Sequence, residues 1–467
     1  MKLKNHDYII TIGAILLATL SLLLIYSTTF QSTTPETGAG TLAKQIIFFI
    51  AGFIIYFLIS TIKISWMKSL KLMLSIYFLT IGSLVYVKIF GEDIANTNRW
   101  ITILGFSIQP AEYAKLNLVL VTAALFGVKK EVLGNIVSWK ENQQRSKFKN
   151  FLIRLNNRRP QLLPTIISAT LALPVILLIF IQPAFGNSII ISIIWLCVLF
   201  AASFNQLKLI NFTLPVLLLS LFSWEVLNIG YGVQVLSTNI SSSELLVVIL
   251  ASMLCALLSR IKIFWVMIAI LIGFSIQPFI QTIWESDIIS PYQKERVEVF
   301  FNSPEDDPLD AGYQVKQSKI AIGSGRVWGR GYLQGTQSAL QVLPFAHTDF
   351  IFASLAEQFG MLGSIILLGI YSAILYRIVK IAIDSNDEFS FLVGIGIAIT
   401  LVLSIFINIG MNMGQLPVTG IPLPLLSYGG SSVLVTLIGL GIVQSIKQDA
   451  KIKDVSESFN PSNSPWR

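Results

Sequence analysis

Long apolar runs separated by short polar segments dominate the chain. A helix that crosses a bilayer needs about 20 mostly apolar residues, and twelve runs approach or reach that length. They lie at residues 8–29, 45–62, 70–90, 111–128, 162–183, 187–204, 209–228, 244–260, 262–284, 351–376, 391–410 and 425–446. No small-residue cleavage site follows the first run, so we interpret it as an uncleaved helix. The pattern predicts an all-α polytopic membrane protein with one multi-span domain over residues 1–447.

The positions of lysine and arginine predict the orientation of the spans. With the N-terminus in the cytoplasm and every run crossing, 23 of the 33 basic residues lie inside, whereas the opposite orientation leaves ten inside. The runs at 209–228 and 244–260 carry the weakest signal. Removing both changes no other assignment, because two crossings restore the original side. We therefore expect both termini in the cytoplasm of a multi-pass protein.

Two loops and a tail interrupt the apolar pattern. Residues 129–161 hold nine basic residues and two acidic ones, and we interpret them as a cytoplasmic loop that anchors by the positive-inside rule rather than as a partner site. Residues 285–350 form a large, polar, extracellular loop, which is where we expect chemistry. The polar composition of residues 448–467, with serine and proline, predicts a cytoplasmic tail without regular structure.

Composition agrees with this picture. Charged residues make up 12% of the chain and hydrophobic residues 54%, whereas soluble domains carry about 25% charged residues. This excludes a cytosolic enzyme, a disordered chain and a nucleic-acid-binding protein. Cys197 and Cys255 both lie in apolar runs, so no disulfide framework is expected.

Charges at membrane depth are costly and therefore informative. Glu112 and Lys115 open the run at 111–128, and a separation of three residues places them on one helix face. They either order the helix bundle as a structural pair or form part of a polar cavity. Their chemistry alone favours neither interpretation.

A second candidate lies where the extracellular loop enters an apolar helix. Asp349 is preceded by His347 and Thr348, and Thr348 or Asp349 suits the N-cap of that helix. The functional alternative is a partly desolvated carboxylate that acts as a general base, with His347 tuning or orienting it.

Two further segments are rich in helix breakers. Residues 323–331 hold four glycines beside Arg326 and Arg330, with Lys319 just upstream. This combination suits the binding of a phosphate group, but a flexible re-entrant loop explains the glycines equally well. Residues 414–424 contain three prolines, and a serine cluster follows at 427–432. Irregular backbone at this depth indicates a polar, outward-facing cleft more than a tight external turn.

These segments together resemble the SEDS family of cell-wall polymerases, the RodA and FtsW proteins. The matching stretches are residues 98–100, 109–115, 292–297, 312–314, 317–325, 347–352, 356–357 and 416–432. Residues 331–338 resemble the RodA, or elongation, branch. The family has ten spans, so the resemblance implies that residues 209–260 are an inserted helix pair.

The resemblance implies a peptidoglycan glycosyltransferase that polymerises lipid II at the outer face of the bacterial cytoplasmic membrane, for cell elongation and shape. Asp349 matches the essential loop aspartate of the family, and we expect it to deprotonate the acceptor hydroxyl. The residues that we assign to substrate binding are Glu112, Lys115, Arg99, Trp100, Lys319, Arg326, Arg330, His347 and Ser431. A divalent cation, Mg²⁺, is the expected cofactor, shared with the pyrophosphate of the substrate. The expected partner is a class B penicillin-binding protein, which is a single-span transpeptidase.

Two alternatives remain open at this point. A lipid II flippase would use the buried charges and broken helices, although no internal repeat is visible. A scaffold that only positions a transpeptidase is suggested by departures from the family pattern, because Ala184, Phe345 and Ala346 stand where charged residues are usual.

Overall fold

The computed structural model of the chain describes residues 6–29, 35–94, 97–103, 106–127, 162–182, 184–202, 294, 311–339, 342–385 and 387–458. Backbone contacts divide the chain into two compact units, Met1–Leu199 with Tyr313–Arg467, and Phe200–Gly312. The architecture below is that of the first unit. The predictions for residues 129–161 and 209–260, and most of the motif at 292–297, lie outside the described residues.

Long helices account for most of the described chain. They are α1 (Tyr8–Thr29), α2 (Pro35–Thr61), α3 (Leu70–Phe90), α4 (Pro110–Gly127), α7 (Leu162–Ile181), α8 (Phe185–Ala202), α15 (Ile351–Ile383), α16 (Glu388–Asn412) and α17 (Gly430–Ser458). These nine helices coincide with nine of the twelve predicted runs, and the other three runs lie outside the described residues. Among the described helices, seven are long and apolar enough to cross a membrane. The all-α polytopic prediction is confirmed.

The last helix differs from its prediction at both ends. α17 begins at Gly430 rather than at residue 425, because Leu425 has a φ of 59°, which lies outside the right-handed helical region. It then continues to Ser458, so the prediction that the tail lacks regular structure from residue 448 is wrong up to that point. An existing helix adds further residues without a new nucleation step, which explains the extension.

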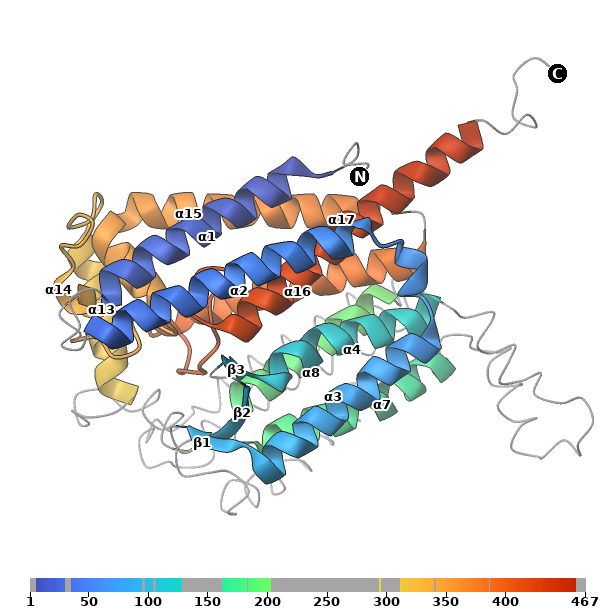
Figure 1. Ribbon diagram of the computed structural model, residues 1–467, viewed down its shortest axis with the longest axis horizontal. Helices are drawn as coiled ribbons and strands as arrows, with labels where there is room; N and C mark the ends of the chain where they lie inside the picture. The colour runs from blue at the N-terminus through green and yellow to red at the C-terminus, as the bar shows by residue number, and fades with distance from the viewer. Residues whose placement is uncertain are drawn as a thin grey trace, which may run out of the picture. The chain divides into compact units, whose positions relative to one another are not determined.

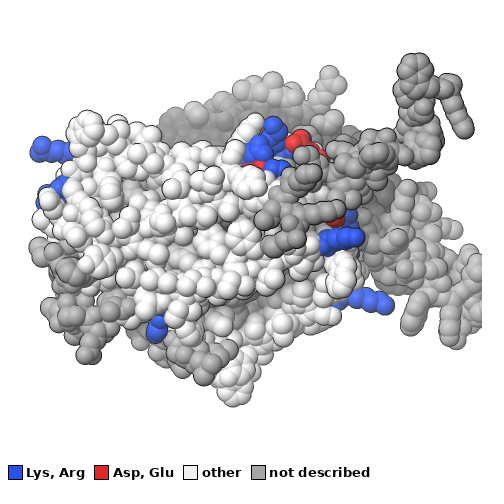
Figure 2. Space-filling view, turned by 45° about the horizontal axis from the view of Figure 1, so that its top comes forward, with Lys and Arg blue, Asp and Glu red and all other residues white. Residues whose placement is uncertain are grey.

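The centre of the first unit is α17, which packs against α2, α4, α15 and α16. Its Val433, Leu437 and Val443 are fully buried. Large apolar side chains such as Leu79, Ile366 and Phe406 are exposed instead, as expected for helices that face lipid. Figure 2 shows a broad uncharged band across the middle of the described surface, with lysine and arginine gathered toward its ends.

One end of the helix bundle carries the irregular parts of the chain. We call it the loop end, where α3 and α16 finish and α4, α15 and α17 begin. Helices α13 (Ala311–Gly325) and α14 (Thr336–Ala339) lie there, together with a small sheet, while α1 starts and α17 finishes at the opposite end (Figure 1). At that opposite end the short helix η2 (Ile64–Trp66) follows α2.

The small sheet joins α3 to α4 and was not predicted from the sequence. It consists of β1 (Glu92–Ile94), β2 (Thr97–Ile103) and β3 (Phe106–Ile108), paired antiparallel in the order β1-β2-β3. Trp100 pairs with Glu92, and Ile101 pairs with Ile108. The sheet packs on α3 and α4 and touches α17, so it fixes the polar segment that leads into α4.

A kink in α15 receives the glycine-rich loop. Gly360 has φ 67° and ψ −161°, a conformation that is essentially restricted to glycine. The amide of Arg330 donates to the carbonyl of Glu357 (2.9 Å), and the amide of Met361 donates to the carbonyl of Arg326 (2.9 Å). Residues 326–331 are therefore held as part of the helix-bundle surface.

Candidate functional site

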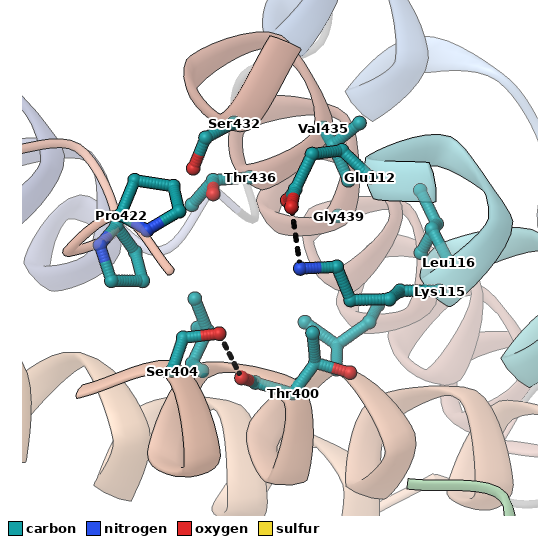
Figure 3. Close-up of a pocket in the computed structure, with 13 residues that line it drawn as sticks. Glu112, Lys115, Leu116, Thr400, Ser404, Pro422, Ser432, Val435, Thr436 and Gly439 are labelled. Carbon is teal, nitrogen blue, oxygen red and sulfur yellow. Dashed lines mark hydrogen bonds and ion pairs between the residues drawn. The ribbon is translucent and has the colours of Figure 1, made fainter. Parts of the chain in front are cut away.

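A buried ion pair lines a small cavity near the loop end. Lys115 Nζ donates to Glu112 Oε1 at 2.6 Å, and their side chains are 3% and 7% exposed. The cavity of about 40 Å³ has room for a few water molecules and lies between α4, α16, α17 and residues 413–429, which we call the proline segment (Figure 3). Its lining is Glu112, Lys115, Leu116, Ile397, Thr400, Leu401, Ser404, Pro422, Pro424, Ser432, Val435, Thr436 and Gly439.

The cavity wall mixes donors and acceptors. The hydroxyls of Thr400 and Ser404 donate to carbonyls of their own helix, both at 2.8 Å. Their oxygen atoms therefore remain available to a ligand only as hydrogen-bond acceptors. Lys115 carries three N–H groups, one of which Glu112 accepts. Ser432 and Thr436 complete the polar wall from α17. Both interpretations of the Glu112–Lys115 pair are therefore realised together, since it is a buried pair and it lines a polar cavity.

Asp349 lies in the turn at residues 344–350 that leads into α15, and it is partly buried. The N-cap of α15 is Phe350, whose side chain makes no capping bond, and the Thr348 hydroxyl donates to the Phe345 carbonyl at 3.2 Å. The expectation that Thr348 or Asp349 caps this helix is therefore wrong. The amide of Ala353 instead donates to Asn412 Oδ1 on α16 at 3.1 Å.

Two asparagines of α16 hold the backbone at Asp349. Asn408 and Asn412, both fully buried, donate their side-chain amides to the Asp349 carbonyl at 3.0 and 2.9 Å. Asn408 also donates to the carbonyl of Ile421 in the proline segment at 2.8 Å. Sequence reasoning missed both residues. The only available signal was an amide pair four residues apart at the end of the apolar run 391–410.

His347 lies in the same turn, beside the other end of the proline segment. Its carbonyl accepts the amide of Tyr428 at 2.9 Å, and the two rings lie 5.8 Å apart. Burial lowers the pKa of His347 from its ordinary value, which favours the neutral imidazole at pH 7.

The proline segment thus has two polar sides. On one side, the Tyr428 amide bonds the His347 carbonyl, and Asn408 of α16 bridges the segment to the Asp349 carbonyl. On the other side, Pro422 and Pro424 line the Glu112–Lys115 cavity. The sequence predicted a polar cleft at this segment, and a polar cavity lies against it.

The glycine-rich loop does not form the predicted phosphate cradle. Its amides at Gly329, Arg330 and Gly331 donate to carbonyls of the protein, so these N–H groups are already used. Arg330 Nη1 donates to Thr336 Oγ1 at 2.8 Å, and the side chain of Arg326 is exposed. The two guanidinium groups, rather than the loop backbone, are what this segment presents to a ligand.

The remaining predicted residues lie around the loop end, outside the cavity lining. Lys319 on α13 packs its aliphatic chain on Gly414. Arg99 Nε on β2 donates to the carbonyl of Gln182 at 3.3 Å, beside the partly buried Trp100. Ser431 accepts the amide of Gln109 at 2.8 Å and so joins the start of α4 to that of α17. The neighbouring Ser432 lines the cavity in its place.

The three departures from the family pattern have different surroundings. Ala346 is 5% exposed and packs with Phe350 and Val418 in a small apolar cluster, whereas Phe345 is 53% exposed. Ala184 is buried between α7 and α8. A charged side chain at position 346 would be buried among apolar groups here, which explains why alanine fits.

The fold and the site define a multi-span all-α membrane protein with a polar cavity near one end of its helices. The chain belongs to the cell cycle protein family of FtsW, RodA and SpoVE, whose sequence model it matches over residues 7–238 and 220–452.

Two curated relatives align along most of the chain, and a third aligns over part of it. Peptidoglycan glycosyltransferase RodA of Treponema pallidum is 29% identical over 457 residues, which cover 95% of this chain and 98% of that protein. A probable peptidoglycan glycosyltransferase FtsW of Buchnera aphidicola is 30% identical over 89% of this chain and 86% of its own length. Peptidoglycan glycosyltransferase MrdB of Escherichia coli K12 is 47% identical, over 37% of this chain and 46% of its own length.

Solved structures share the fold. A chain from a study of polymerization and crosslinking by a peptidoglycan synthase complex superposes with a TM-score of 0.60 at 23% identity, covering 95% of this chain and 98% of that chain. Rod shape determining protein RodA of Thermus thermophilus superposes with a TM-score of 0.52 at 20% identity, covering 95% and 97%.

Proposed function

We propose that this chain is a peptidoglycan glycosyltransferase that polymerises lipid II into glycan strands at the outer face of the cytoplasmic membrane, in the service of cell elongation. Family membership and the names of relatives that align over almost the full length support the activity. The loop end then faces outward, and both termini lie in the cytoplasm, as the positive-inside rule predicts.

One structural observation carries the proposal beyond the family name. The turn with Asp349 and the cavity with Glu112 and Lys115 lie on two sides of the proline segment. A carboxylate at the membrane surface is thereby joined to a polar, partly enclosed cavity at membrane depth. A lipid-linked sugar needs both, because its sugar reacts in the aqueous phase while its lipid stays in the bilayer.

The proposed reaction is a displacement at the anomeric carbon of a lipid-linked sugar pyrophosphate. Asp349 accepts the proton of the acceptor hydroxyl as that oxygen attacks, because a sugar alcohol is a weak nucleophile while it keeps its proton. The bond to the pyrophosphate breaks, and the leaving group takes up the negative charge. Lys319, Arg326 and Arg330, which lie around the loop end, are the cations that would stabilise it.

Magnesium belongs to the substrate complex in this proposal. Within the described residues, no group of three or more His, Cys, Asp or Glu side chains gathers as a metal cage. Mg²⁺ commonly binds through substrate phosphates and one or two carboxylates, so pyrophosphate would supply most of its ligands. A class B penicillin-binding protein is the proposed partner, because the structural neighbour described above concerns polymerization together with crosslinking.

The test is lipid II polymerisation by the purified full chain in detergent, with and without the transpeptidase partner and Mg²⁺. Wild type is compared with Asp349→Asn, and with Asp384→Asn at the opposite, exposed end of the same helix as a matched control. We expect glycan chains from wild type and Asp384→Asn, and a loss of at least about 100-fold for Asp349→Asn. Full polymerisation by folded Asp349→Asn would remove the base assignment. Inactivity of the wild type with its partner would favour the flippase or the scaffold.

A further inference from the structure

The amides of Asn408 and Asn412 converge on one oxygen, the carbonyl of Asp349. Each side-chain amide has two N–H donors. Asn408 uses its second donor on the Ile421 carbonyl at 2.8 Å, and Asn412 uses its second on the Asn408 carbonyl at 2.8 Å. Because both residues are fully buried, water does not compete for these bonds.

The pair also makes α15 independent of Asp349 as a cap. Asn412 Oδ1 accepts the Ala353 amide, which is one of the unsatisfied donors in the first turn of α15. A neighbouring helix thus fills the capping role that a short polar residue before a helix would usually take. The helix does not require the Asp349 carboxylate for its own start.

We propose that Asn408 and Asn412 are positioning residues that fix the Asp349 carboxylate relative to the proline segment and the Glu112–Lys115 cavity. This inference rests on the proposed function, in which Asp349 is the base. Asn408 is the key member, since one amide joins the Asp349 carbonyl to that of Ile421, directly before the cavity-lining Pro422.

Residues of other elements hold this turn at successive carbonyls: Ser354 bonds that of Ala346, Tyr428 bonds that of His347, and the two asparagines bond that of Asp349. The turn is closed by hydrogen bonds from the amides of Thr348 and Phe350 to the single carbonyl of Phe345 (3.0 and 3.3 Å), and Phe345 has a φ of 54°, which is unusual for a residue with a side chain. A displacement of about 1 Å can cost about 100-fold in rate. The two asparagines hold the turn from the rigid α16.

The first variant is Asn408→Leu, which keeps the approximate shape and removes both donors. Asn117→Leu is the matched control, because Asn117 is also a buried asparagine, on α4, and bonds Thr80 on α3 instead. Asn412→Asp is the second variant. It retains an acceptor for the Ala353 amide and loses at least one of the two N–H donors that bond the Asp349 and Asn408 carbonyls. It therefore weakens positioning while it keeps the cap, and it provides a second test if Asn408→Leu folds poorly.

Steady-state lipid II polymerisation and thermal unfolding are measured for each variant. We expect kcat to fall about 10- to 100-fold for Asn408→Leu and Asn412→Asp with KM within about threefold of wild type, and Asn117→Leu to keep kcat. Each asparagine variant is then combined with Asp349→Asn in single-turnover assays at high enzyme concentration. If the asparagines act through Asp349, the double variants are no slower than Asp349→Asn. A merely structural defect would multiply the two losses.

Different failures point to different errors. If Asp349→Asn is inactive while Asn408→Leu and Asn412→Asp both keep wild-type kcat, the positioning role is wrong and the base assignment stands. If the losses multiply in the double variants, the asparagines support folding and not Asp349. If Asp349→Asn keeps full activity, the base assignment in the proposed function is wrong, and the positioning role that rests on it is wrong as well.

Discussion

The burial of the Glu112–Lys115 pair leads to an energetic prediction that separates its structural role from its proposed role in substrate binding. Lys115→Met removes the cation and leaves the Glu112 carboxylate in a cavity where it is 7% exposed. Glu112→Gln leaves the ammonium in the same position. The double variant Glu112→Gln/Lys115→Met removes both charges while it keeps the approximate volume of both side chains.

The magnitude follows from the burial of the pair. Removing one partner of a buried ion pair costs about 3–5 kcal/mol, whereas replacing both by uncharged groups of similar volume is often neutral. With an unfolding entropy of about 2.1 cal/mol/K per residue, 1 kcal/mol corresponds to about 1 °C in a chain of 467 residues. Each single variant should therefore unfold about 3–5 °C below wild type, and the double variant within about 1 °C of it.

Thermal unfolding in one detergent, followed by intrinsic tryptophan fluorescence, measures the stability, and lipid II polymerisation measures the function. We expect the double variant to recover its unfolding temperature and to be inactive, because the cavity has lost both charges that we propose bind the substrate. A double variant as unstable as either single variant would refute the compensation argument. A stable double variant with wild-type activity would refute the role of the cavity.

Three further perturbations test the surroundings of the site and the helix ends. Burial lowers the pKa of His347, so the unfolded chain binds that proton more tightly and the stability of the fold decreases as the pH drops below about 6.5. Between about pH 7.5 and 5.5, the unfolding temperature of His347→Gln should therefore fall less than that of wild type. An equal fall in both proteins would contradict this. Asp387 is the N-cap of α16 and accepts the amide of Ser390, so Asp387→Ala should cost about 1 kcal/mol, seen as a lower unfolding temperature, while Asp387→Asn retains most of the cap. Gly360→Ala should lower the free energy of unfolding by about 1–3 kcal/mol or more, because alanine is strained in the backbone conformation of Gly360. Gly369→Ala, with open space at its Cβ position, should be neutral or stabilising. Equal unfolding temperatures of the two variants would refute the strain at the kink.

The sequence by itself determined the helices and the local pair. The thickness of the bilayer fixes how many consecutive apolar residues a span needs, so α1 and α3 were predicted with the bounds that the structure has. The spacing of Glu112 and Lys115 placed both on one helix face, and they form the predicted pair. These properties depend on neighbouring residues alone.

The tertiary structure decided which groups satisfy one another across the bundle. Asp349 was predicted as a cap or a base, but its carbonyl is held by residues 59 and 63 positions further along the chain. The glycine-rich loop suited either a phosphate or a flexible re-entrant loop, yet the amides of Arg330 and Gly331 bond to α15, just before its kink at Gly360. A hydrogen-bond donor has many acceptors of equal chemistry along the chain, and only the packing of the helices decides which one lies within 3 Å. The span positions follow from local hydrophobicity, whereas the site depends on contacts between distant segments.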